Sequence, residues 1–135
     1  MRIITTTIFL GLTLLLTVCC FEDFDERCQR ESIEYTVKHC PRRMDEHTIM
    51  DSMVYDINTR TLNYHYTIEG ILDSDSVMTP KACNTLEENI KSHIINSVDL
   101  KIHKDRGINF CYCYHSQSTG KIRARVTVTK DDYAQ

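Results

Sequence analysis

The chain has 135 residues, and its 16 Lys and Arg residues stand against 19 Asp and Glu residues, which gives a net charge of −3. Past residue 20, roughly 115 residues remain, the usual size of one domain, so a second domain is not expected. The mild acidity and the lack of a basic stripe exclude nucleic acid as an expected partner. With only four Gly and two Pro in the chain, we expect disorder only at the two ends.

The first 20 residues have the pattern of a secretory signal. Arg2 is followed by the uncharged stretch 3–18, by Cys19 and Cys20, and then by an abruptly acidic run. A short positive start, an apolar core and a small-residue exit are typical of signal peptides. The sequence therefore predicts a signal peptide over 1–20 and an exported product in the cell envelope, at the outer membrane or in the periplasm.

The end of this segment resembles the lipobox of bacterial lipoproteins, in which a cysteine becomes the lipidated first residue. Such boxes usually place Gly, Ala or Ser before the cysteine, whereas Val18 precedes Cys19 here. Three outcomes stay open, in this order: lipidation at Cys19 or Cys20, simple cleavage, and an uncleaved membrane helix. The acidic run 21–27 resembles export tags of Bacteroidetes surface lipoproteins, and a solvated tether explains it equally well.

The first half of the mature chain reads as a helix followed by a hairpin. Apolar residues at spacings of four and three, namely Ile33, Val37 and Cys40, predict an amphipathic helix over 26–40. Alternating residues predict strands over 48–56 and 61–68. The period of two places four side chains on one face of the second strand: Leu62, Tyr64, Tyr66 and Ile68.

The second half repeats this order. Thr79 and Pro80 predict the start of a helix, whose buried stripe is Leu86, Ile90 and Ile94 and continues through Val98 and Ile102 to Gly107, unless Asn96–Ser97 breaks it. Two strands follow over 108–115 and 121–129, with a glycine-containing turn between them. Their apolar faces are predicted to carry Ile108, Phe110, Tyr112 and Tyr114 on one strand and Ile122, Ala124, Val126 and Val128 on the other.

The predicted fold class is α+β with the order helix, hairpin, helix, hairpin. Two such units would form a four-stranded antiparallel sheet covered on one face by two helices. This interpretation gives one domain over 28–130 and a short tail over 131–135, and it leaves the strand order open.

Five cysteines follow the predicted signal: Cys28, Cys40, Cys83, Cys111 and Cys113. An exported protein can form disulfides. Cys28 and Cys40 cannot bridge each other, because twelve residues of one helix separate them by about 18 Å. Free buried thiols are the favoured interpretation, and a bridge from Cys28 or Cys40 to Cys83 is the alternative.

The pattern also resembles small uncharacterised secreted or lipid-anchored proteins of Bacteroidetes. The resemblance is carried by Cys40-Pro41, by the hairpin spanning 54–66, and by the segment 110–114 with its polar loop before Lys121. It implies an envelope location and a domain of this layout. It brings no assigned activity and no functional residues.

A candidate metal site lies on the other face of the predicted sheet. Cys111, Cys113 and His115 alternate with the apolar set and therefore project together, and His65 points the same way on its own strand. Thiolates and imidazoles are the ligands that zinc and copper prefer. The competing interpretation is an open face with half-buried thiols, and Arg123 and Arg125 nearby would disfavour a cation.

The same face offers a polar binding surface. Asn63, His65, Arg123 and Arg125 could bind an acidic ligand or partner, although a solvated antiparallel sheet accounts for them equally well. Motifs of hydrolases and phosphate-binding loops are absent, so we expect no enzyme and no cofactor, with a Cys113–His65 pair as the catalytic alternative.

The sequence thus predicts an exported, envelope-associated protein that binds a protein or small ligand through the open sheet face. A lipid anchor would add contact with the membrane. The alternatives are a thiol or metal-binding protein using Cys111, Cys113 and His115, and a secreted protease inhibitor, the latter by fold analogy alone.

Overall fold

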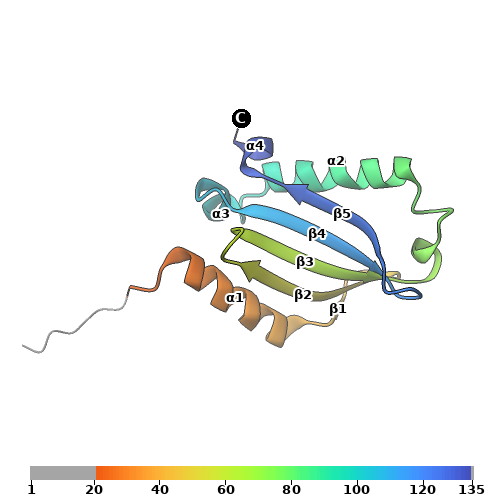
Figure 1. The fold of residues 1–135 in the computed structure, drawn as a ribbon, viewed down its shortest axis with the longest axis horizontal. Coiled ribbons are helices and arrows are strands. Elements are labelled where there is room, and N and C mark those ends of the chain that lie inside the picture. Colours follow the sequence, from red (N-terminus) through yellow and green to blue (C-terminus); the bar gives the residue numbers. More distant parts are fainter. Residues whose placement is uncertain (1–20, 135) are drawn as a thin grey trace, which may run out of the picture.

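The structure, a computed structural model that describes residues 21–134, is a five-stranded sheet with helices packed on one of its faces (Figure 1). The predicted signal peptide, with the predicted lipidation at Cys19 or Cys20, lies outside the described residues. The strands are β1 (Arg42–Arg43), β2 (Thr48–Asp56), β3 (Thr61–Ile68), β4 (Asn109–Ser116) and β5 (Ile122–Val128). The helices are α1 (Phe24–His39), the 3-10 turn η1 (Gly70–Asp73), α2 (Pro80–Asn96), α3 (Lys101–Asp105) and α4 (Lys130–Tyr133).

The sheet follows chain order, β1-β2-β3-β4-β5, and it is mixed. The α+β class is confirmed, and so are the bounds predicted for β2 and β3. The expected four-stranded antiparallel sheet is wrong in two respects, because β1 adds a short fifth strand and β3 pairs with β4 in parallel. The connection between β3 and β4 carries α2 past the sheet and back to the starting end, and such a crossover returns the chain in the same direction.

The core lies between the sheet and α2. Ile90 and Ile94 of α2 pack in one cluster with residues of the three central and C-terminal strands: Leu62, Phe110, Tyr112, Val126 and Val128. These residues all come from the stripes and faces that the sequence predicted. Ile122 is the exception at 45% exposed, because the β4–β5 pairing shifts register beside it.

The second helix ends earlier than its apolar pattern suggests. Ser97 caps α2, and α3 then forms a separate short helix. Val98 and Ile102, which were expected to extend the buried stripe, are 81% and 61% exposed. Gly107 ends this region in the left-handed conformation, with φ at 70°, as its position predicted.

The first helix turns a different face to the protein from the one predicted. Ile33 is 54% exposed and Val37 is 78% exposed, whereas Cys28 and Ser32 are buried. The reason is that α1 packs beside β2, at the edge of the sheet that the two-residue strand β1 leaves largely unpaired. A helix in this place needs polar side chains that can form hydrogen bonds with the backbone groups at the strand edge.

Two hydroxyls of α1 supply those groups. The Ser32 Oγ accepts a hydrogen bond from the backbone N–H of Tyr55 at 3.0 Å. The Thr36 Oγ1 accepts from the N–H of Met53 and donates to the carbonyl oxygen of Met53, both at 2.8 Å. Unpaired strand edges are templates for aggregation and are costly when buried, so these bonds both satisfy and protect β2.

The two chain ends of the domain are structured. Helix α1 begins at Phe24, inside the run expected to be a tether, and the Tyr55 hydroxyl donates to Asp25 Oδ1 at 2.5 Å while Arg60 lies 3.2 Å from the same oxygen. In the expected tail, the Tyr133 hydroxyl of α4 donates to the Ile108 carbonyl at 2.7 Å. The folded unit is therefore wider than 28–130 at both ends.

All five cysteines of the described part are free thiols, but only Cys28, Cys111 and Cys113 are buried, whereas Cys40 and Cys83 are partly exposed. The favoured interpretation of free buried thiols therefore holds for three of the five. Across residues 21–134, no helix combines the length and the apolar character needed to cross a bilayer.

Replacing Ser32 with Ala tests the contact between α1 and the strand edge. The change leaves the buried N–H of Tyr55 without a partner, so the free energy of unfolding should fall by about 1–3 kcal/mol. Denaturation in urea measures it. As the matched control, Ser92→Ala alters an exposed serine of α2 and should stay within about 0.5 kcal/mol of the parent protein. Equal effects of the two changes would contradict the role given to Ser32.

The pH dependence of stability tests the Asp25 contact. The hydrogen bond from Tyr55, followed by Arg60, lowers the pKa of Asp25 in the folded state. Its ionised form therefore stabilises the fold above the unfolded pKa, which is near 4, and this contribution disappears as the pH falls through the folded value. The free energy of unfolding should decline more between about pH 5 and about pH 3 in the parent protein than in Asp25→Asn. Parallel pH profiles would contradict this assignment.

Candidate functional site

The two faces of the sheet carry different chemistry. One face packs against the helices. The other, called the open face below, carries Asn63, His65 and Thr67 of β3, Cys111, Cys113 and His115 of β4, and Arg125 and Thr127 of β5, which alternate with the core residues. Each face holds one candidate site.

On the open face, His65, Cys113 and His115 come together. The parallel pairing of β3 with β4 sets His65 opposite Cys113 and places His115 two residues further along β4. One potential ligand atom from each residue lies within 4.8 Å of the other two, and His65 Nδ1 is 3.3 Å from His115 Nε2. Burial, followed by the nearby His115, lowers the pKa of His65, which favours a neutral imidazole able to donate a lone pair.

Cys111 sits beside this group. Its Sγ is 3.8 Å from the Sγ of Cys113 and accepts a hydrogen bond from the Thr127 hydroxyl, but it is not one of the atoms that lie mutually within 4.8 Å. Cys111 and Cys113 are 7% and 3% exposed, so the open face is covered at this point by their neighbours. Burial raises the pKa of the Cys111 thiol.

The residues predicted to form a polar binding surface do not gather into one. Arg125 stands opposite Cys113 and interacts with that side chain, which raises the pKa of the guanidinium. The Asn63 amide donates to the backbone oxygens of Val54 and Thr61. Arg123 turns to the loop around η1, where it pairs with Asp73 and Asp75. Of the four, His65 and Arg125 adjoin the cysteines, and the other two make local contacts.

The helix-facing side holds a groove. Helix α1 packs along β2 and α2 lies over β5, so the middle strands β3 and β4 are left between them (Figure 1). Two hollows of about 390 Å³ and 330 Å³ lie there, and they adjoin because both are lined by Met44 and Tyr66. The remaining lining residues are Asp45, Thr48, Ile68, Leu72, Met78, Ala82, Leu86 and Tyr114 in the first hollow, and Tyr35, Met50, Tyr64, His93, Ser97, Asp99, Leu100 and Tyr112 in the second.

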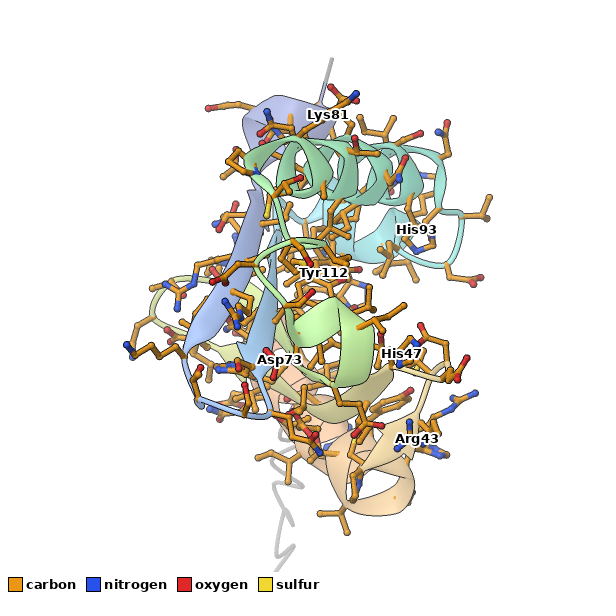
Figure 2. All side chains as sticks on the ribbon, turned by 90° about the vertical axis from the view of Figure 1, so that its right-hand side faces the viewer. Arg43, His47, Asp73, Lys81, His93 and Tyr112 are labelled. Carbon is orange, nitrogen blue, oxygen red and sulfur yellow. The ribbon has the colours of Figure 1, made fainter. Side chains whose placement is uncertain are left out.

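A row of stacked tyrosines forms the floor of this groove. The ring centroids are 4.6 Å apart for Tyr64 and Tyr112, 6.1 Å for Tyr112 and Tyr66, and 5.0 Å for Tyr66 and Tyr114. In Figure 2 the labelled Tyr112 lies below α2 and above α1. The register of β3 on β4 pairs Tyr64 with Tyr112 and Tyr66 with Tyr114, which builds the row.

The groove has solvent-accessible hydroxyls and one sign of charge. Burial raises the pKa of Tyr64 and Tyr114 to about 12. Within residues 21–134 the four floor hydroxyls make no intramolecular hydrogen bond and are not among the buried groups that lack a partner. Asp45 lines the first hollow, Asp99 and His93 line the second, and neither hollow is lined by Lys or Arg. The site can therefore bind an apolar surface, donate hydrogen bonds and attract positive charge.

Sequence reasoning located one of the two sites. The open-face cluster follows from alternation alone, once β3 and β4 are neighbours. The sequence placed the four tyrosines on the apolar faces of two predicted strands, and their hydroxyls on those faces were the available signal for a binding floor. The groove itself depends on where α1 packs, which the apolar stripe of that helix did not indicate.

Several solved structures share this fold. One is a Pseudomonas aeruginosa protein that is inferred to be secreted. It aligns with a TM-score of 0.67 at 13% identity, over 83% of this chain and 96% of its own. The EpsS pilotin of the Vibrio vulnificus type 2 secretion system aligns with a TM-score of 0.61 at 10% identity, over 80% and 89%. The AspS pilotin of the Vibrio cholerae type II system gives 0.55 at 14% identity, over 80% and 90%. At these identities the likeness establishes the fold alone.

Sequence similarity gives a family. No curated protein matches the chain significantly. The predicted resemblance to Bacteroidetes proteins stays a prediction. Residues 23–124, more than half of the chain, match the family model described as a domain of unknown function, DUF8479. The chain belongs to this family.

Proposed function

We propose that this protein is an exported, non-catalytic accessory protein of the cell envelope that binds a segment of a partner protein in the groove between α1 and α2. The observation that carries the proposal is the stacked tyrosine floor, which lines the two hollows between the helices and whose hydroxyls make no intramolecular hydrogen bond in the described residues. This replaces the open sheet face as the expected contact surface, because Asn63 and Arg123 of that face are engaged in local contacts.

Tyrosine is suited to protein recognition. Its ring gives a large apolar contact at low cost in side-chain entropy, and its hydroxyl adds a directional hydrogen bond. Tyr, Met and other aromatic residues are enriched at the centres of protein interfaces, and Met44 and Met78 stand in the groove wall. Stacking fixes the rings before binding, so less freedom is lost when a partner arrives.

The charge of the groove narrows the class of partner that it can bind. Asp45 lines the first hollow and Asp99 the second, and no Lys or Arg lines either one. Complementary charge steers association and fixes register more than it adds raw affinity. The expected partner is therefore an apolar segment flanked by Lys or Arg.

The location rests on two independent supports. The first 20 residues have the pattern of a secretory signal. The fold is shared with two secretion-system pilotins and with a protein described as secreted. A role as an envelope accessory agrees with both, and binding in the groove requires no catalytic group.

A peptide-display selection on the immobilised mature protein tests the proposal. Selected peptides should combine apolar residues with Lys or Arg, and Asp99→Lys should weaken their binding roughly three- to tenfold. Glu88→Lys is the matched control, since it makes the same charge change at an exposed position of α2 outside the groove lining. Titration calorimetry measures both.

A second variant tests the contribution of the tyrosine floor separately from that of the charge of the groove. Tyr66 lines both hollows, so Tyr66→Ala should reduce affinity by more than tenfold, as removal of a central interface aromatic does. Circular dichroism and thermal melting establish that the variant is folded. The proposal is wrong if the selected peptides are acidic, or if folded Tyr66→Ala binds as well as the parent protein.

A further inference from the structure

The open face carries a cluster that the groove does not use. His65, Cys113 and His115 lie on two adjacent central strands, where the backbone is held by hydrogen bonds on both sides. Cys113 is only 3% exposed, and the two histidines are partly buried. A preformed set of soft and imidazole donors within 4.8 Å of one another is a candidate metal site.

One distance matches that of a metal shell. Two imidazole nitrogens bound to one ion at about 2.0–2.1 Å lie about 3.3–3.6 Å apart in tetrahedral or trigonal geometry, and His65 Nδ1 is 3.3 Å from His115 Nε2. Cys111 is outside the mutual group, so the preformed set has three ligands. The Sγ of Cys111 is 3.8 Å from that of Cys113, which is close enough for Cys111 to join the set by side-chain rotation.

We infer that His65, Cys113 and His115 bind a copper(I) ion, with Cys111 as an additional sulfur ligand. A set of two histidines and one cysteine is the trigonal arrangement of copper sites, and thiolates select copper(I).

The charge of the surroundings agrees with a monovalent ion. Arg125 stands opposite Cys113 in the pairing of β4 with β5, so a positive guanidinium lies on the same face beside the ligand. Copper(I) with one thiolate is neutral overall, whereas zinc with one thiolate keeps a positive charge next to Arg125. If Cys111 also binds, the copper site becomes anionic and Arg125 balances it, while a zinc site with two thiolates is neutral. For the three preformed ligands, Arg125 therefore favours copper(I) over zinc.

Anaerobic titration of the reduced mature protein with copper(I), in competition with a chromophoric copper(I) chelator, tests the inference. The protein should retain one equivalent, and Cys113→Ser and His65→Asn should each lower the affinity at least about tenfold. Cys83→Ser is the control, because that thiol lies on α2, away from the site, and its loss should leave the affinity unchanged.

X-ray absorption spectroscopy of copper(I) bound to the unsubstituted protein identifies the ligand atoms directly, so the inference can be tested even if a variant fails to fold. The expected shell contains imidazole nitrogen as well as sulfur. A sulfur-only shell, or equal effects of Cys83→Ser and Cys113→Ser, would show adventitious binding to thiols and overturn the site. Retention of zinc without retention of copper(I) would overturn the choice of metal.

Discussion

The hydrogen bonds between α1 and the edge of β2 determine what the rest of the molecule exposes. Ser32 and Thr36 replace the strand partner that β1 is too short to provide, and they hold the helix at the side of the sheet. A helix that packed its predicted apolar stripe would lie over the middle strands and bury the tyrosines. Because α1 stays at the edge, Tyr64, Tyr66 and Tyr114 of β3 and β4 remain partly exposed between it and α2. The groove is the direct result.

One strand pairing then builds both candidate sites. The parallel register of β3 on β4 matches tyrosine with tyrosine on the helix-facing side and His65 with Cys113 on the other. A slip of β4 by one residue would turn its side chains over, sending Tyr112 and Tyr114 to the open side and Cys111 and Cys113 to the groove. Buried Leu62 and Phe110, which are partners in the same pairing, hold the register through the core. The two sites therefore depend on the same structural element while facing opposite sides of the sheet.

Local patterns predicted the elements of this fold better than their arrangement. The strands β2 and β3 have the bounds that alternation indicated, and Ile90 and Ile94 are buried as the helical spacing required. The parallel pairing depends on how a long crossover packs, and no local pattern records it. Ile33 and Val37 gave the wrong buried face for α1, because apolar spacing identifies a helix but not the surface against which it packs. That surface is the edge of β2, to which Ser32 and Thr36 hydrogen-bond. The open-face cluster needed only alternation and one adjacency, so it was predictable, whereas the groove required the position of α1.

The central claim is that the partner binds in the groove on the helix-facing side of the sheet. A photo-crosslinking amino acid placed at Met44, which lines both hollows and is 49% exposed, tests it most directly in living cells, with the same residue at Thr127 of the open face for comparison. The account predicts a discrete adduct from position 44, mapped by mass spectrometry to a partner segment bearing Lys or Arg, and none from position 127. An adduct formed from position 127 alone would contradict it.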